Sequence, residues 1–274
     1  MPPPPRTRAR RPPLGTEARP LPRPELPGAL CMQGSYGSRT RAPHRTTLLL
    51  TTAYARPVII VPGLHVAERT AGGRCYLVEH PLACVLIDTG APDGTLGASH
   101  LLESAGRRPE EVRLILVTHG HRGHAGNAAG LRVLTGAPVG ATAEVAEALA
   151  HPPPASGGLR RLLGGGAVEP VSVDRVLEPG EVIDLAGGIA VIDAPGHVLG
   201  SAAFHLLLPD ALCVGDAASV DRHGALAPPP ARHSQDAATA RATAATLAAV
   251  NARVLAPGHG FASVGGRLPV RGRR

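Results

Sequence analysis

The chain of 274 residues contains no lysine and no tryptophan, and only three tyrosines and two phenylalanines. Without lysine it cannot form the Gly-x-x-x-x-Gly-Lys loop that cradles nucleotide phosphates. With so few aromatic side chains there is little on which nucleic-acid bases could stack, so we expect no specific nucleic-acid partner. The sequence also lacks a Gly-x-Ser-x-Gly elbow, which argues against a serine hydrolase.

Long apolar runs are missing as well, and the charge is unevenly spread. No run approaches the about 18 apolar residues of a membrane-spanning helix, so we expect no membrane partner. Positions 1–57 hold ten arginines against two glutamates, whereas 58–266 holds 14 arginines and 19 acidic residues. We therefore expect residues 1–55 to be a disordered extension rich in proline and arginine, 56–264 to be one folded domain, and 265–274 to be a basic tail.

The cysteines show no metal-binding or redox spacing. Cys31, Cys75, Cys84 and Cys213 contain no Cys-x-x-Cys pair. Such a pattern is typical of buried or free thiols in a reducing compartment, so we expect a cytoplasmic protein. A secretion signal has little support, because the apolar run at 48–50 is much shorter than the usual about 7 to 15 residues.

Histidine is the residue that stands out in what the chain does contain. The segment Thr118-His119-Gly120-His121-Arg122-Gly123-His124 follows the apolar run 112–117. Side chains two apart on a strand face the same way, so a strand end can aim several imidazoles at one point. Three later segments repeat one pattern, in which an apolar run and a glycine turn precede a metal ligand: Pro195-Gly196-His197, Val214-Gly215-Asp216 and Pro257-Gly258-His259. This pattern predicts a metal cage at a sheet edge.

The ligand types restrict the chemistry. Neutral imidazoles with one carboxylate suit zinc, and also iron, cobalt or manganese. An open coordination position lowers the pKa of a bound water towards about 7 and supplies hydroxide at neutral pH. Such a hydroxide attacks the carbonyl carbon of an ester, thioester, lactone or amide, or a phosphoester phosphorus, while the metal polarises the electrophile.

Together with Asp88-Thr89-Gly90, these segments resemble the metallo-β-lactamase superfamily over about residues 58–262. The resemblance implies a four-layer αβ/βα sandwich with the metal site at one edge of the sheets. It implies that His119, His121 and His197 hold a first metal, that His124 and His259 hold a second, and that Asp216 bridges the two. We assign catalytic roles to Asp216 and His124 as well. Asp88 would steady the ligand loop without binding metal.

One position departs from the family pattern. The family's cluster is His-x-His-x-Asp-His, and this chain has Gly123 where the aspartate stands. We therefore expect the second metal to bind less tightly, since one negatively charged ligand is missing. Asp221 and Asp193 are the carboxylates that we consider as replacements.

We therefore expect a metal-dependent hydrolase of a small ester, thioester or lactone, of the hydroxyacylglutathione-hydrolase type, with one or two Zn²⁺ ions or with iron or manganese. One alternative is a mononuclear iron enzyme similar to the persulfide dioxygenases of this superfamily, using His119, His197 and Asp216. The other is a non-catalytic, degenerate member, because of Gly123. The expected partner is a small-molecule substrate, and the oligomeric state stays open.

The secondary-structure pattern fits this resemblance. Strands are predicted at 74–79, 83–87, 112–117, 138–141, 189–194, 202–208 and 211–214, and helices at 94–106, from about 126, at 142–150 with Thr142 as N-cap, and at 235–250. Two loops rich in proline and glycine, 152–166 and 219–235, have the length and composition of walls around a substrate site. The second loop contains His223 and His233, which flank its proline-rich stretch after Asp216 and are the two further histidines of most interest.

Overall fold

A computed structural model describes residues 58–67, 72–92, 95–153 and 167–268 of the chain. These residues belong to the unit Arg45–Arg274. The predicted disordered extension, 1–55, lies outside the described residues, as do most of the loop 152–166 and positions 269–274 of the predicted tail.

The first sheet has seven strands that pair in chain order. Its strands are β1 (Val58–Val61), β2 (Leu64–Ala67), β3 (Cys75–His80), β4 (Ala83–Ile87), β5 (Val112–Leu116), β6 (Val139–Ala141) and β7 (Arg175–Val176). The strands β1 to β4 pair antiparallel, whereas β4 to β7 pair parallel. Parallel neighbours need long crossovers, and helices supply them between β4 and β5 and between β5 and β6.

The second sheet has six strands in the order β15, β14, β11, β10, β9, β8. Their bounds are Ser263–Val264, Val254–Pro257, Ala211–Gly215, Ala202–Leu206, Ile189–Asp193 and Val182–Ile183. The one parallel pair among them, β11 with β14, is joined through the helix α6 (Ala237–Ala249). A separate small hairpin, β12 (Ser219–Val220) with β13 (Leu226–Ala227), branches from the chain after β11.

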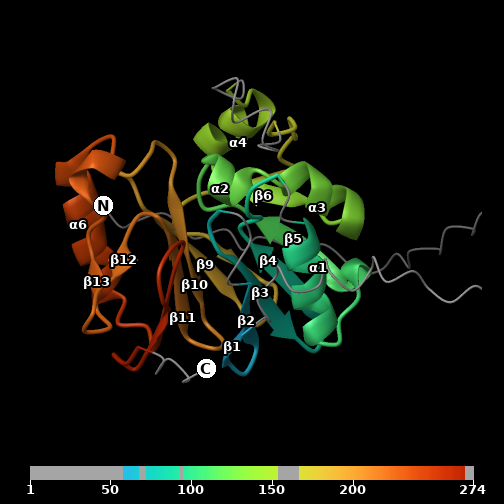
Figure 1. The fold of residues 1–274 in the computed structure, drawn as a ribbon, viewed down its shortest axis with the longest axis horizontal. Coiled ribbons are helices and arrows are strands. Elements are labelled where there is room, and N and C mark those ends of the chain that lie inside the picture. The colour runs from blue at the N-terminus through green and yellow to red at the C-terminus, as the bar shows by residue number, and fades with distance from the viewer. Residues whose placement is uncertain (1–57, 68–71, 93–94, 154–166, 269–274) are drawn as a thin grey trace, which may run out of the picture. The chain divides into compact units, whose positions relative to one another are not determined.

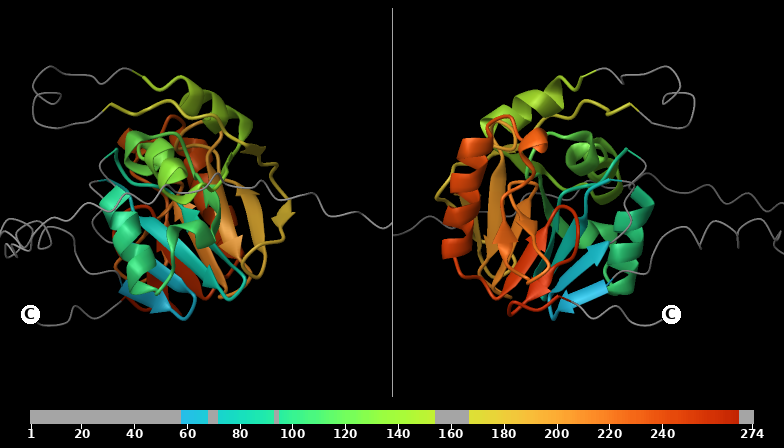
Figure 2. Two further views of the ribbon diagram at one scale, coloured as in Figure 1. Left: turned by 90° about the vertical axis from the view of Figure 1, so that its right-hand side faces the viewer. Right: turned by 60° about the vertical axis from the view of Figure 1, so that its left-hand side comes forward.

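Helices cover the outer faces of the two sheets. They are α1 (Thr95–Ser104), α2 (Arg122–Ala125), α3 (Ala128–Thr135), α4 (Ala143–Ala150) and α6, with short 3-10 turns η1 (Pro109–Glu111) and η2 (Ala231–His233). Figures 1 and 2 show α1 and α3 against the first sheet and α6 against the second, with the two sheets face to face between them. The predicted four-layer αβ/βα sandwich is therefore confirmed.

The alternation of side chains along one strand shows how the layers are joined. In β4 all five residues are buried, because both faces of the first sheet are covered. Val85 and Ile87 pack into the core between the sheets, while Cys84 and Leu86 pack into the core beneath the helices. Phe204 of β10 lies fully buried in the same intersheet core. A period of two in a continuous apolar run therefore serves two cores at once.

The predicted elements lie close to the observed ones. The differences are the cap of α4 and the short strands β1, β2, β7, β8, β12, β13 and β15, which were not predicted. Thr142 does precede α4, but its hydroxyl donates to the Gly200 carbonyl at 2.7 Å and does not cap the helix. Strands β1 and β2 were not predicted, since their short run is broken by Pro62 and Gly63 at a tight turn.

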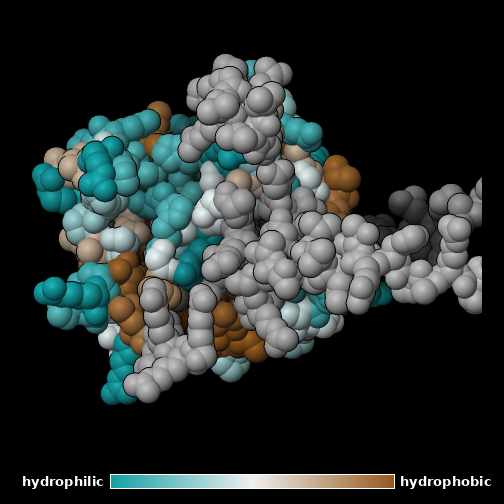
Figure 3. Space-filling model, in the orientation of Figure 1, coloured by the Kyte–Doolittle hydropathy of each residue, from teal (hydrophilic) through white to brown (hydrophobic). Residues whose placement is uncertain are grey.

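Exposed apolar side chains gather at the end of the sandwich where the edge strand β1 lies, and Figure 3 shows brown surface in this region. Ile59 is 64% exposed, and Val58 and Phe261 are also exposed. Among the described helices, none is both long and apolar enough to cross a membrane.

Candidate metal centre

The predicted ligands come together at one edge of the two sheets, from segments far apart in sequence. His119 and His121 follow β5, and His124 lies in α2. His197, Asp216 and His259 follow β9, β11 and β14, respectively. Strand ends hold these loops in place, which is how a sheet scaffold positions functional side chains.

Glycines let two of these turns form. Gly196 and Gly215, which precede His197 and Asp216, have φ of 113° and 51°. A Cβ on Gly215 would lie 2.6 Å from the Thr118 hydroxyl oxygen, so the chain after β11 approaches the histidine loop too closely for any side chain there. Gly196 and Gly215 are therefore required by backbone conformation and by space.

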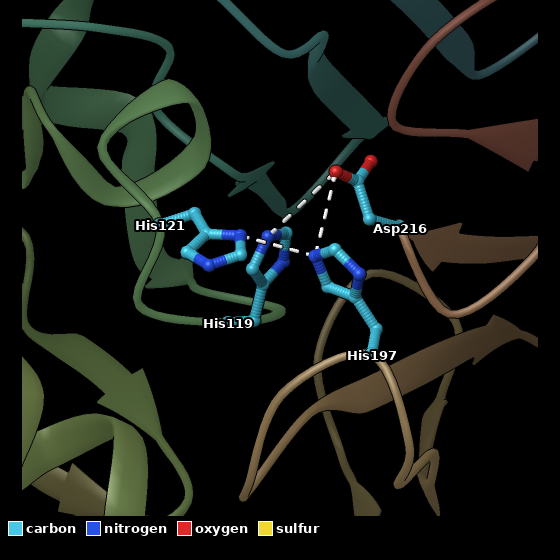
Figure 4. A group of neighbouring side chains, drawn as sticks. All are labelled: His119, His121, His197 and Asp216. Carbon is cyan, nitrogen blue, oxygen red and sulfur yellow. Dashed lines mark hydrogen bonds and ion pairs between the residues drawn. The ribbon is translucent and has the colours of Figure 1, made fainter. Parts of the chain in front are cut away.

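Four side chains form the first ligand group: His119, His121, His197 and Asp216. Figure 4 shows them pointing toward one another. The His197 Nε2 lies 3.0 Å from the His121 Nδ1 and 3.6 Å from the Asp216 Oδ2, and the His119 Nε2 lies 3.9 Å from the same oxygen. Ligands at about 2.0 to 2.2 Å from a tetrahedral zinc ion are separated by about 3.3 to 3.6 Å, so this spacing fits a metal.

The second group consists of His124, Asp216 and His259. The His124 Nε2 lies 3.3 Å from the His259 Nε2 and 3.3 Å from the Asp216 Oδ1. His124 is fully buried, whereas the His259 side chain is 59% exposed. Asp216 belongs to both groups, so it is the side chain that can bridge two ions.

Asp88 fixes which nitrogen of two histidines carries the proton. Its Oδ2 accepts from the His124 Nδ1 at 2.7 Å, so the His124 Nε2 is the nitrogen that faces the second group and can bind a metal once its proton is displaced. The Thr118 hydroxyl donates to Asp88 at 2.9 Å, so its oxygen accepts from the His119 Nδ1 at 3.0 Å. The His119 Nε2 is then the unprotonated nitrogen. A carboxylate behind a histidine is the arrangement that orients metal-binding imidazoles in proteins.

The backbone of Asp88 is itself unusual. Its φ of 58° is in the left-handed region, which residues other than glycine seldom adopt. The Asp88 amide donates to the Leu116 carbonyl at 2.8 Å, and its carboxylate accepts from the Thr118 amide at 2.8 Å. These bonds hold an unfavourable conformation at the point where it serves the ligands.

The surroundings of the first ligand group favour neutral imidazoles, whose nitrogen lone pairs can bind a metal. Burial lowers the pKa of His119, His121 and His197, so they are neutral ligands at pH 7. Burial also acts to lower the pKa of His124, but the carboxylates of Asp88 and Asp216 outweigh it and raise that pKa to about 10. A cation binding in the second group therefore displaces a proton from His124.

The residues present fit a metal ion. The His119 Nε2 is buried without a hydrogen-bond partner, although buried polar atoms are nearly always paired. The facing nitrogens of His121 and His197 lie 3.0 Å apart, and those of His124 and His259 lie 3.3 Å apart. One cation could be bound by both nitrogens of each pair. Four histidine and carboxylate donors in one group match the ligand preference of zinc and neighbouring transition metals.

Gly123 lies where the resemblance places an aspartate, and the segment Gly72–Gly73 packs against it. The Gly73 amide donates to the Gly123 carbonyl at 2.7 Å, and a Cβ on Gly123 would lie 3.2 Å from that amide nitrogen. A Cβ on Gly73 would in turn overlap the His124 ring. The two segments thus pack backbone to backbone beside the second ligand group.

Neither carboxylate considered as a replacement joins the ligands in the described structure. Asp221 accepts from the backbone amides of His223 and Ala225 in a turn. Asp193 is exposed on β9, and neither residue belongs to a ligand group.

Four of the ligand residues line a cavity of about 540 Å³: His121, His197, Asp216 and His259. Beyond the ligands, it is lined by Ala218, Ser219, Pro229, Pro230 and His233. The second predicted loop, 219–235, thus forms a wall of the site. His233 lies on that wall, whereas His223 lines a separate cavity of 250 Å³. Ala218 was not predicted as a residue of the site, and its position two residues after Asp216 is the signal that could have indicated it.

Comparison with known proteins agrees with this geometry. The model of the metallo-beta-lactamase superfamily matches residues 70–259, so the chain belongs to that superfamily. A hydroxyacylglutathione hydrolase from Hyphomonas neptunium is 30% identical over 143 residues, which are 52% of this chain and 46% of the relative. The alignment thus spans about half the length of that relative.

Among solved structures, the subclass B3 metallo-beta-lactamase BJP-1 of Bradyrhizobium japonicum has a TM-score of 0.60 at 24% identity, covering 76% of this chain and 79% of the other. The metallo-beta-lactamase MIM-1 from Novosphingobium pentaromativorans has a TM-score of 0.59 at 26% identity, covering 75% and 77%. These likenesses agree with the fold described above.

Proposed function

We propose that the protein is a zinc-dependent hydrolase of small esters, thioesters or lactones. The observation that carries the proposal is that two ligand groups share Asp216, which lines the cavity beside them. The hydroxyacylglutathione hydrolase that is similar to about half of this chain supports an acyl substrate.

The chain's own residues define how such a site works. His119, His121, His197 and Asp216 would hold one ion, and His124, His259 and Asp216 would hold another. A metal bound there supplies Lewis acidity, which polarises an acyl carbonyl and lowers the pKa of water. Burial keeps the histidines of the first group neutral, Asp88 orients His119 and His124, and Asp216 would hold the two ions side by side so that both act on one substrate.

The test is turnover of short acyl esters, thioesters and lactones by protein stripped of metal and then supplied with Zn²⁺. We expect activity to require the metal and to be abolished in His121→Ala. His100→Ala, on α1 away from the ligands, is the matched control and should keep full activity. Full turnover in His121→Ala would refute the proposal. Oxygen uptake with a persulfide, only with iron, would support the dioxygenase alternative instead.

We also propose that the two metal positions differ in affinity. The first group has four protein donors, whereas the second has three, one of them on the exposed His259. The packing of Gly72–Gly73 against Gly123 explains the missing donor, because a side chain at 123 would press on that backbone.

A titration of metal-free protein with Zn²⁺, followed by calorimetry, tests this difference. We expect two unequal binding events, and we expect His259→Ala to remove only the weaker one. Gly123→Asp adds a carboxylate, and Gly123→Ala is its matched control for packing. Two equal, tight sites in the unaltered protein would contradict the proposed asymmetry.

A further inference from the structure

The cavity wall that faces the metal ligands offers few polar groups. Of its residues that are not ligands, Ser219 and His233 alone carry polar side chains among the described lining. The Ser219 hydroxyl already donates to the Ala227 carbonyl at 3.3 Å. The His233 ring is exposed and has no hydrogen-bond partner among the described residues, so it is the wall group that is free to bind a ligand.

Backbone hydrogen bonds tie the turn that contains His233 to the loop of the predicted metal ligand His197. The His233 amide donates to the Pro230 carbonyl at 2.8 Å and closes the turn η2. Two residues on, the Gln235 amide donates to the His197 carbonyl at 2.9 Å, and the Gln235 side chain accepts from the Leu199 amide at 3.1 Å. The backbone at His233 is therefore fixed relative to the ligand loop, and it places the imidazole beside the ligands.

The rest of the wall is apolar, and the described lining contains no arginine. Ala218, Pro229 and Pro230 present carbon atoms, and the chain has no lysine at all. Recognition of a carboxylate or phosphate on a substrate typically uses an arginine or lysine. The one charged side chain in this lining is the carboxylate of Asp216.

We infer that the site takes an uncharged acyl substrate, whose carbon chain packs on Ala218, Pro229 and Pro230 and whose polar group is hydrogen-bonded by the His233 imidazole. This inference rests on the proposed hydrolase function and narrows its substrate class. His233 is a positioning residue, which binds the substrate in the ground state and in the transition state alike. Its loss therefore raises KM and leaves kcat nearly unchanged.

Two esters of equal chain length test the substrate class. They are 4-nitrophenyl hexanoate and the 4-nitrophenyl monoester of adipic acid, which differ by a terminal methyl group against a carboxylate. We expect the zinc-loaded protein to prefer the hexanoate by about tenfold or more in kcat/KM. This factor corresponds to the cost of burying the carboxylate of the adipate without a hydrogen-bond partner. An equal rate or a preference for the adipate would overturn the inference.

Variants of the wall test the role of His233. We expect His233→Ala to raise KM for the hexanoate by about three- to tenfold, the range of one hydrogen bond, with kcat and metal content unchanged. His233→Gln keeps a donor and should restore most of the affinity. His223→Ala, outside this cavity, is the matched control and should behave as the unaltered protein. An unchanged KM in His233→Ala would exclude the proposed role.

A binding measurement separates this inference from the proposed function. Hexanoyl hydroxamate and its adipoyl analogue carry the same metal-binding group and need no turnover. If the protein hydrolyses neither ester but binds the neutral hydroxamate more tightly, and His233→Ala weakens that binding, the hydrolase proposal fails and the inference about the pocket stands. If both hydroxamates bind equally, the inference fails whatever the ester activity.

Discussion

Replacing Asp88 with asparagine is the change whose effect can be worked out most directly from the structure. The two side chains have the same shape, so no cavity forms, and the retained oxygen still accepts from the Thr118 amide. The new NH₂ group stands where Oδ2 accepts from the His124 Nδ1 at 2.7 Å. Two donors then face one another, and His124 must move its proton to Nε2, which blocks the lone pair that points at the second ligand group.

The cost follows from the kind of bond that is lost. A buried hydrogen bond to a charged group contributes about 1.5 to 3 kcal/mol. Altering the partner behind a metal-binding histidine weakens metal binding by about 10- to 100-fold. We therefore expect Asp88→Asn to weaken the second Zn²⁺ by this factor, and the first by less than about threefold, since Thr118 can still donate to the remaining oxygen and keep the His119 tautomer.

Calorimetric titration with Zn²⁺ in the presence of a competing chelator measures both affinities in one experiment. Asp193→Asn, which changes an exposed carboxylate outside both ligand groups, is the control and should bind as the unaltered protein does. Unchanged affinity at the second position in Asp88→Asn would refute the argument that Asp88 sets the His124 tautomer.

Three further predictions concern space, pH and packing. In Gly258→Ala the added Cβ would overlap the His124 ring and lie 2.5 Å from the Asp216 Oδ1, so zinc affinity should fall by about tenfold or more, whereas Gly136→Ala, with open space around it, should not change it. The pKa of His124 is raised in the native state, so the folded protein keeps a proton that the unfolded chain loses above about pH 6.5. The free energy of unfolding of the metal-free protein should therefore fall as pH rises from 6.5 to 8, and should fall less in Asp88→Asn. Urea denaturation that shows a flat or rising profile over this range would contradict the prediction. Phe204→Ala, fully buried between the sheets, should lower the free energy of unfolding by about 3 to 5 kcal/mol, against little change for the exposed Leu207→Ala, as measured by urea denaturation.

Much of the site could be predicted because its ligands follow a local rule. A buried run, a glycine and a ligand can be recognised within a few residues, as at Gly215 and Asp216, where the backbone conformation requires the glycine. The alternation in β4 likewise follows from a continuous apolar run. These features depend on residues that are close together in the sequence, so they can be predicted from the sequence alone.

Other features depend on contacts between distant segments and could not be predicted. The packing of Gly72–Gly73 against Gly123 joins segments about fifty positions apart and has no local pattern. Thr142 has the sequence of an N-cap, but the Gly200 carbonyl takes its hydroxyl. His223 and His233 have no local sequence feature that distinguishes a residue of the site from one outside it. Only the fold of the loop around Pro229 and Pro230 places His233, and not His223, at the cavity.

The most direct test of the central claim is the metal content per chain, measured by elemental analysis after dialysis of zinc-loaded protein against metal-free buffer. The account predicts about one tightly held zinc ion in the unaltered protein and in His259→Ala, and none in His121→Ala, because the four-donor group holds metal more firmly than the three-donor group. Absence of retained zinc in the unaltered protein, or equal retention in His121→Ala, would contradict the assignment of these side chains as a metal centre.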